Sequence, residues 1–250
     1  MEFPFSLPAL RTILAVSCLA ILLGWETARP YFALFGSRGA SGKSRWRHAA
    51  SNLALGLLNA VLVALLFSGL WLWTTQWASA HHFGLLHRFD LPAWGKAAIA
   101  ILLLDVWMYA WHRLNHRLPF FWRFHRLHHA DRAMDVTTAS RFHTGEIVFS
   151  SILRVPVLLM IGCTIGELAL YEILLFLVVQ FHHANIALPD RLDRCLRLFI
   201  VTPSLHKVHH SVLRVEHDSN YSSLFCWWDM IFRTRRLLPD PHRIVFGVED

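Results

Sequence analysis

The 250-residue sequence is short of charge and of cysteine, and each shortage excludes a class of protein. Charged residues make up 16% of the chain and its mean hydropathy is +0.39, whereas soluble domains carry about 25% charged residues, so an ordinary soluble domain is excluded. The four cysteines form no Cys-x-x-Cys pair, which leaves no zinc knuckle and no disulfide framework. No GxGxxG, P-loop or CxxCH motif occurs, so the sequence predicts no nucleotide or haem cofactor of its own.

Long apolar runs are present instead, and hydrophobic residues make up 55% of the chain. A helix needs about 20 apolar residues to cross a bilayer. Candidate spans are residues 12–34, 49–77 and 97–111, and residues 146–180 are long enough for a two-helix hairpin. The first run resembles a membrane helix more than a signal peptide. These runs predict an all-α membrane protein with about four to five transmembrane or hairpin helices.

Histidine is abundant and clustered in short motifs. The chain has 17 histidines, and the pattern His-x-x-His-His occurs twice, at 125–129 and 206–210. A random order of the same residues would contain only about 0.08 copies of this pattern. A His-x-x-x-His motif at 112–116 and the segment FHHAN at 181–185 complete the set. Nine candidate metal ligands result: His112, His116, His125, His128, His129, His183, His206, His209 and His210.

The spacing of these histidines indicates a metal site. Residues three and four apart share one side of a helix, where several imidazoles can converge on an ion that keeps them neutral. A single zinc ion takes four ligands, so nine candidates predict two ions, although imidazole binds iron, copper, nickel and zinc alike. Asp105 lies two helical turns before His112 and could accept its second ring proton; the alternative is a buried partner for an arginine.

Both histidine-rich regions are expected on one face of the membrane, because the hairpin between them returns the chain to its starting side. The same face receives a large set of basic residues: Arg38, Lys43, Arg45, Arg47, Arg113, Arg117, Arg123, Arg126 and Arg132. The positive-inside rule predicts that this face is cytoplasmic. We expect it to carry a helical cap with the histidine-rich di-metal site. The net charge of +7 is then explained by basic residues that fix the topology and contact anionic lipid headgroups. No nucleic-acid partner is expected.

At these residues the chain resembles the fatty acid hydroxylase and sterol desaturase superfamily of membrane di-iron enzymes. The superfamily pattern is an Asp, aromatic residues, His-x-x-x-His, a short spacer with Trp, and His-x-x-His-His; residues 105–130 read DVWMYAWHRLNHRLPFFWRFHRLHHA. Further similar segments are TTASRFHTGE (137–146), FHHANIALP (181–189), TPSLHKVHHS (202–211) and NYSSLFCWWDMIFRTRR (220–236). The resemblance covers about residues 97–236, and order, spacing and flanking residues agree together.

The resemblance implies that the nine histidines hold two iron ions and that O2 is a co-substrate. It also implies a lipid substrate that arrives from the bilayer and a separate electron donor, either a reductase or a small electron carrier. His183 is implied as the ninth ligand by its place before Ala184 and Asn185, with His182 as the alternative. Other candidates, near the ligands but not assigned as ligands, are Asp105, His143, His182, Asn185, Asn220 and Asp229.

The expected activity is therefore an oxidoreductase reaction that hydroxylates or desaturates a C–H bond of a sterol, fatty acyl chain or related lipid. A zinc-dependent membrane lipid hydrolase and a histidine-rich metal transporter remain alternatives. Lys207 and Arg126, inside the repeated motifs, either contact a headgroup or electron donor or are solvated cations or snorkelling anchors. The expected organisation is an N-terminal transmembrane region (1–96), a catalytic region (97–236) and a C-terminal tail (237–250).

Overall fold

The computed structural model describes residues 7–35 and 42–249, and this part of the chain is helical, without a β-strand. The longer helices are α1 (Leu7–Ala28), α2 (Gly42–Leu66), α3 (Ser68–Ala80), α4 (Ala93–Arg117), α6 (Thr144–Ile161) and α7 (Ile165–His183). The shorter elements are α5 (Pro119–His129), α8 (Asp190–Leu196), α9 (Pro203–His209), α10 (Arg214–His217), α11 (Trp227–Ile231) and the 3-10 turns η1 (Leu85–Arg88), η2 (Val136–Ser140) and η3 (Pro241–Arg243).

Five helices, α1, α2, α4, α6 and α7, are long and apolar enough to cross a membrane. Their outer surfaces are apolar: Leu65 and Ile21, for example, expose 78% and 68% of their area. Such a surface is stable only when lipid or protein covers it. The prediction of an all-α membrane protein with four to five spanning or hairpin helices is confirmed.

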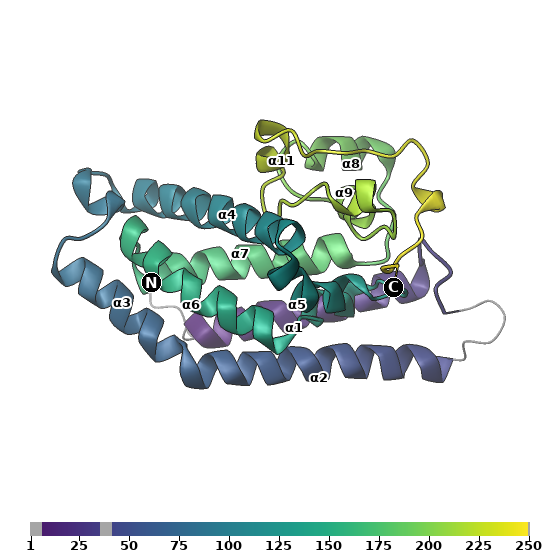
Figure 1. The fold of residues 1–250 in the computed structure, drawn as a ribbon, viewed down its shortest axis with the longest axis horizontal. Coiled ribbons are helices and arrows are strands. Elements are labelled where there is room, and N and C mark those ends of the chain that lie inside the picture. Colours follow the sequence, from purple (N-terminus) through teal and green to yellow (C-terminus); the bar gives the residue numbers. More distant parts are fainter. Residues whose placement is uncertain (1–6, 36–41, 250) are drawn as a thin grey trace.

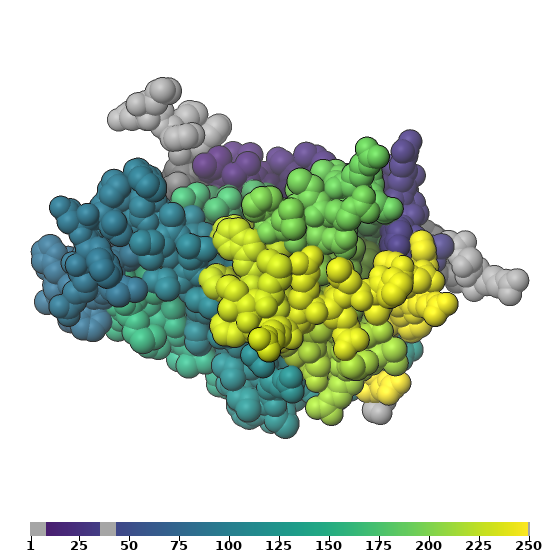
Figure 2. Space-filling view, turned by 90° about the horizontal axis from the view of Figure 1, so that it is seen from above, coloured from purple at the N-terminus to yellow at the C-terminus, as the bar shows by residue number. Residues whose placement is uncertain are grey.

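The short helices form a cap at one end of the bundle. Figure 1 shows α8, α9 and α11 gathered beside the C-terminal ends of α4 and α7. Seen from above in Figure 2, the segments after α7 cover this end of the molecule in green and yellow. The histidine motifs at the ends of α4, α5, α7 and α9 are therefore brought to the junction between bundle and cap.

The apolar run expected as one span over residues 49–77 is divided at Phe67 into α2 and α3. Ser68 and Gly69 follow the break, and the Ser68 hydroxyl donates to the carbonyl of Ala64 at 2.6 Å. A serine–glycine pair with such back-bonding commonly bends a helix. Trp71 then fastens α3 to α6 by donating its indole N–H to the carbonyl of Ser151 at 3.2 Å.

A buried carboxylate stabilises the end of α1, the helix interrupted in sequence by acidic and basic residues. Glu26 is only 1% exposed and accepts hydrogen bonds from the backbone N–H groups of Val136 at 3.0 Å and Asn185 at 2.9 Å. Its other oxygen pairs with Arg45 at 3.0 Å. Glu26 therefore links α1 to η2, to the end of α7 and to α2. These partners compensate for burying its charge in an apolar helix.

The predicted hairpin over residues 146–180 is confirmed as α6 and α7, joined by a three-residue turn. Gly162 ends α6 in the left-handed region, at φ 73°. Thr164 begins α7 with a capping box, since its hydroxyl accepts from Glu167 N at 3.2 Å and the Glu167 carboxylate accepts from Thr164 N at 2.7 Å. Pro156 lies inside α6 without ending it.

The turn gives a first testable prediction, because Gly162 has no room for a side chain. A Cβ there would lie 2.5 Å from the carbonyl oxygen of Phe83, and its positive φ disfavours any L-residue with a side chain. Gly162→Ala should lower the free energy of unfolding by about 1–3 kcal/mol in a denaturant titration of the detergent-solubilised protein. Gly166→Ala is the control, since its Cβ would meet only Thr164 Oγ1 at 3.9 Å. Equal stability of the two variants would contradict this account of the turn.

Candidate metal centre

The first two histidine motifs are brought together by a sharp change of direction between α4 and α5. Leu118 is extended, as expected before a proline, and Pro119 occupies the first turn of α5, where its missing N–H breaks no helical hydrogen bond. His112 and His116 lie in the last two turns of α4, and the 125–129 motif ends α5. The imidazoles of both helices consequently face the same space.

All nine predicted ligands converge in two groups, in each of which one potential ligand atom per residue lies within 4.8 Å of the others. The five-histidine cluster comprises His112, His116, His125, His129 and His209. The four-histidine cluster comprises His128, His183, His206 and His210. Every member is buried, and the clusters adjoin, since the rings of His129 and His210 stack with centroids 4.4 Å apart.

Helix geometry explains how each repeated motif is divided between the clusters. At 3.6 residues per turn, side chains four residues apart differ by about 40° around the helix, whereas those three apart differ by about 60° in the opposite sense. The first and last histidines of the 125–129 motif join the five-histidine cluster, and its middle histidine joins the four-histidine cluster. In the 206–210 motif the division is reversed. The two copies therefore interlock the two clusters.

In the five-histidine cluster, backbone carbonyls fix the tautomers of two rings. His112 Nδ1 donates to the carbonyl of Tyr221 at 2.8 Å, and His209 Nδ1 donates to that of Ser219 at 2.6 Å. A neutral imidazole has only one N–H, so both Nε2 atoms carry lone pairs. These two Nε2 atoms nevertheless lie 2.9 Å apart. Facing lone pairs repel one another, and a shared cation would turn this repulsion into ligation.

The four-histidine cluster is arranged in the same way. His183 Nδ1 donates to the carbonyl of Val179 at 2.7 Å, which leaves a lone pair on Nε2. That Nε2 lies 3.1 Å from Nε2 of both His128 and His206. One ring proton cannot satisfy three converging nitrogens, so this cluster also has the donor set of a metal site.

Burial favours the neutral, metal-binding form of five of these imidazoles. Loss of solvation, and in second place the neighbouring imidazoles, hold the pKa values of five rings outside the spanning helices well below the usual 6.5: His128, His129, His206, His209 and His210. Both ring nitrogens of His116 and of His129 have no hydrogen-bond partner within the described part of the chain. Buried polar atoms are rarely left so, and bound metal would satisfy them.

Comparison with known proteins identifies the family. Residues 97–234, more than half of the chain, match the fatty acid hydroxylase family. The chain belongs to this family. The match includes all nine histidines of the two clusters. No solved structure matches the chain.

Named relatives of this fatty acid hydroxylase family member act on different lipids. A cholesterol 25-hydroxylase-like protein of Danio rerio is 30% identical over 194 residues, covering 76% of this chain and 73% of that protein. The ornithine lipid hydroxylase OlsE of Rhizobium tropici is 27% identical over 153 residues, 61% of this chain and 45% of that protein. An alkylglycerol monooxygenase of Danio rerio is 29% identical over 165 residues, 65% of this chain and 35% of that protein. The chain thus spans less than half the length of the last two relatives.

Asp105 has a different role from the one expected, because it does not accept the second ring proton of His112, which goes to a backbone carbonyl. The Asp105 carboxylate accepts from the indole N–H of Trp228 at 2.7 Å, from Phe225 N at 3.0 Å and from the Tyr171 hydroxyl at 3.3 Å. The alternative of an arginine partner is not found among these contacts either. Asp105 fastens the cap to α4 and α7 in this family member.

Asp229 and Asn220 hold the backbone that orients the candidate ligands. Asp229 accepts from Tyr221 N at 2.8 Å, and the carbonyl of Tyr221 is the acceptor for His112. Asn220 has a positive φ of 52° and donates from its amide to the carbonyl of Leu205, in the helix that carries the last motif. Each of these two residues hydrogen-bonds backbone that in turn positions a histidine.

The remaining sequence candidates lie at or outside the edge of the clusters. Asn185 exchanges hydrogen bonds with the backbone of Phe32, at 2.9 and 2.8 Å. His143 is exposed and caps α6 by accepting a backbone N–H. His182 is buried, with its ring centroid 3.9 Å from that of His206, but it belongs to neither cluster, whereas His183 does.

Sequence reasoning missed one carboxylate at the site. Glu146 is 5% exposed and accepts a hydrogen bond from His125 Nδ1 at 2.9 Å, so that the His125 Nε2 lone pair is free for metal. The signal in the sequence is an acidic residue at the start of the predicted hairpin, at the end of the segment TTASRFHTGE. A carboxylate behind a ligating histidine fixes its tautomer and raises its basicity.

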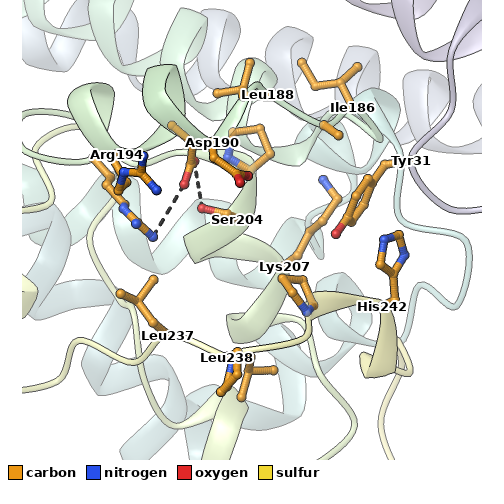
Figure 3. A pocket seen from close by; sticks show the side chains of 16 residues that line it. Tyr31, Ile186, Leu188, Asp190, Arg194, Ser204, Lys207, Leu237, Leu238 and His242 are labelled. Carbon is orange, nitrogen blue, oxygen red and sulfur yellow. Dashed lines mark hydrogen bonds and ion pairs between the residues drawn. The ribbon is translucent and has the colours of Figure 1, made fainter.

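Lys207 points away from the clusters, on the other side of α9. It is 1% exposed and donates to the carbonyl of Ala184 at 2.5 Å, so the solvated-cation interpretation is wrong for this residue. It lines a cavity of about 390 Å³ between α8, α9 and the C-terminal segment. Figure 3 shows Asp190, Arg194 and His242 around the same cavity. α9 thus lies between the histidine clusters and this cavity.

Proposed function

We propose that this chain is an integral-membrane di-iron oxygenase that uses O2 and external electrons to hydroxylate a C–H bond of a lipid. The observation that carries the proposal is the pair of interlocked histidine clusters in a member of the fatty acid hydroxylase family. Nine clustered imidazoles exceed the four ligands of one zinc ion, which supports two ions. When bound, the iron pair supplies the reactivity with dioxygen that a C–H oxidation needs.

The chain's own contribution is to hold the ligands and exclude water. Backbone carbonyls and Glu146 orient the rings, and all nine are buried. Phe142 closes one side of the four-histidine cluster by stacking on His128, with ring centroids 4.3 Å apart. A dry site with fixed ligands directs the oxidation to a bound lipid and prevents side reactions with solvent.

The relatives support a lipid substrate and favour hydroxylation over desaturation. Their names describe hydroxylation or monooxygenation of an ornithine lipid, an alkylglycerol and a sterol. These molecules share long apolar parts and differ in their headgroups. We therefore assign the chain to lipid hydroxylation and leave the headgroup to experiment.

The proposed reaction requires electrons that this chain does not generate. Its sequence has no motif for a flavin, haem or iron–sulfur cofactor. A separate donor protein is needed, and the exposed Arg123 and Arg126 on α5 provide positive charge beside the clusters for an acidic partner.

The test of function is lipid mass spectrometry of cells with and without the protein under 18O2. We expect one lipid to gain a single 18O atom only when the wild-type chain is present. A hydrolysed lipid formed equally well without oxygen would support the zinc hydrolase instead. Metal movement across the membrane with no lipid product would support the transporter.

We further propose that the histidine clusters face the cytoplasm. Basic residues near the cluster end of the bundle, among them Arg45, Arg113 and Arg117, support this orientation; Arg38 lies outside the described residues. In a Cys195→Ser background, Val215→Cys on α10 should react with a membrane-impermeant thiol reagent only after the cells are permeabilised. Asp90→Cys, in the loop at the opposite end of the bundle, should react with the same reagent in intact cells. The reverse labelling pattern would overturn the orientation.

A further inference from the structure

A third group of potential metal ligands adjoins the five-histidine cluster. It consists of His116, His217 and Asp218, whose ligand atoms lie within 4.8 Å of one another, and we call it the outer site. His217 ends α10 and Asp218 is its C-cap, so both come from a segment outside the repeated histidine motifs. His116 is the member that the outer site shares with the five-histidine cluster.

The His217 ring is held in a defined orientation. Its face stacks on Trp122, with centroids 5.4 Å apart and an interplanar angle of 18°. Its Nδ1 donates to the carbonyl of Ser211 at 3.3 Å, which leaves a lone pair on Nε2. The ring centroid lies 5.9 Å from that of His116 and 6.0 Å from that of His129. His217 is therefore a neighbour of the buried ligands with an unused nitrogen.

His116 is placed to serve both groups. Its side chain is fully buried, yet neither ring nitrogen has a hydrogen-bond partner among the described residues. Its ring lies among the other members of the five-histidine cluster, 4.6 Å from that of His209 and 4.7 Å from that of His129. Its Nδ1 lies 3.7 Å from Asp218 Oδ1. One imidazole thus spans the step from the outer site to the buried cluster.

Exposure falls from the outer site to the inner clusters. The Asp218 side chain is 17% exposed and His217 is half-buried, whereas all nine inner ligands are buried. A hydrated ion cannot reach nine buried imidazoles without first exchanging water for protein ligands, and a carboxylate with two imidazoles is a suitable first set.

We propose that the outer site is the point of metal uptake, where a divalent ion binds His217 and Asp218 and then passes through His116 into the five-histidine cluster. This inference rests on the proposed di-metal function. It assigns no ligand role to His217 in the loaded protein, and it requires that His217 and Asp218 affect how fast metal binds and not how much is bound.

Arg214 is expected to oppose metal binding at the outer site, because it pairs with Asp218. Its Nε lies 3.4 Å from Asp218 Oδ2, and its side chain is 84% exposed, so its guanidinium competes with an arriving cation for the carboxylate. Removing this positive charge should accelerate uptake, whereas removing the carboxylate should slow it. Opposite effects of two neighbouring substitutions are not expected from a general loss of folding.

The experiment is a time course of Fe(II) binding to the full chain, stripped of metal in detergent micelles under anaerobic conditions. We expect His217→Gln and Asp218→Asn each to slow uptake by roughly tenfold, and Arg214→Gln to accelerate it severalfold, within the range that local charge exerts on association rates. Equilibrium binding should remain at the wild-type value in all three. Glu216→Gln is the matched control, because it removes a negative charge from α10 outside the outer site and should leave the rate unchanged.

Unchanged uptake rates in both His217→Gln and Asp218→Asn would overturn the inference while leaving the proposed function intact. Loss of one ion at equilibrium from His217→Gln would also overturn it, since His217 would then be an ordinary ligand. A wild-type chain that binds no metal would refute the proposed function and this inference together.

Discussion

Replacing His209 by alanine should reduce bound metal from two ions to one and lower lipid oxidation by roughly 100-fold or more. His209 supplies the five-histidine cluster with an Nε2 that lies 2.9 Å from Nε2 of His112. The four-histidine cluster keeps all its members in this variant. Elemental analysis of the anaerobically purified protein measures the metal, and mass spectrometry of the product lipid measures the activity.

Two companion variants make this result specific. His206→Ala should cause the complementary loss, of the ion in the four-histidine cluster. His81→Ala should keep both ions and full activity, because its exposed ring contacts Trp77, by stacking at 4.4 Å and by a hydrogen bond from Nδ1 to the Trp77 carbonyl at 2.9 Å, at the opposite end of the bundle. Two bound ions with full activity in His209→Ala would refute the assignment of ligands.

Glu146→Ala should weaken metal binding at the five-histidine cluster by about 10–100-fold without changing the four-histidine cluster. The Glu146 carboxylate accepts the N–H of His125 at 2.9 Å and keeps the opposite nitrogen available as a ligand. Without it, His125 loses its fixed tautomer and part of its basicity. Glu146→Gln retains an acceptor oxygen but no charge and should fall between wild type and Glu146→Ala. Competition for iron against a chelator of known affinity measures the effect.

The control for this charge is at the other end of the hairpin. Glu167→Gln removes a carboxylate that caps α7, and its amide oxygen can still accept the hydrogen bond from Thr164 N. Its metal affinity should equal that of the wild type. If Glu146→Ala bound both ions as tightly as Glu167→Gln, the carboxylate would have no role in holding the cluster.

The helical membrane fold could be predicted from the sequence because long apolar runs have few structural alternatives. The break between α2 and α3 is not predicted, because the apolar run of the sequence resumes after Ser68 and Gly69 and continues to Trp77. It depends on a hydrogen bond from Ser68 to Ala64 and on the contact of Trp71 with Ser151, which joins residues 80 positions apart. Such contacts are visible only once the chain is folded.

The positions of the nine histidines could likewise be predicted, because their spacing follows the helical repeat. The orientation of their rings could not. The acceptor carbonyls for His112 and His209 lie in an irregular segment between α10 and α11, and Glu146 is 21 residues away from the ring it holds. For Asp105 the spacing was misleading. It places Asp105 on the same helix face as His112, but the Asp105 carboxylate accepts a hydrogen bond from Trp228 in the cap.

In the proposed enzyme the two interlocked clusters hold a pair of iron ions. Metal analysis of the wild-type protein, purified without oxygen, is the decisive measurement. We predict close to two iron ions per chain, together with an oxidised lipid product when O2 and an electron donor are supplied. Zinc alone, in a protein that hydrolyses lipid without oxygen, would contradict this assignment.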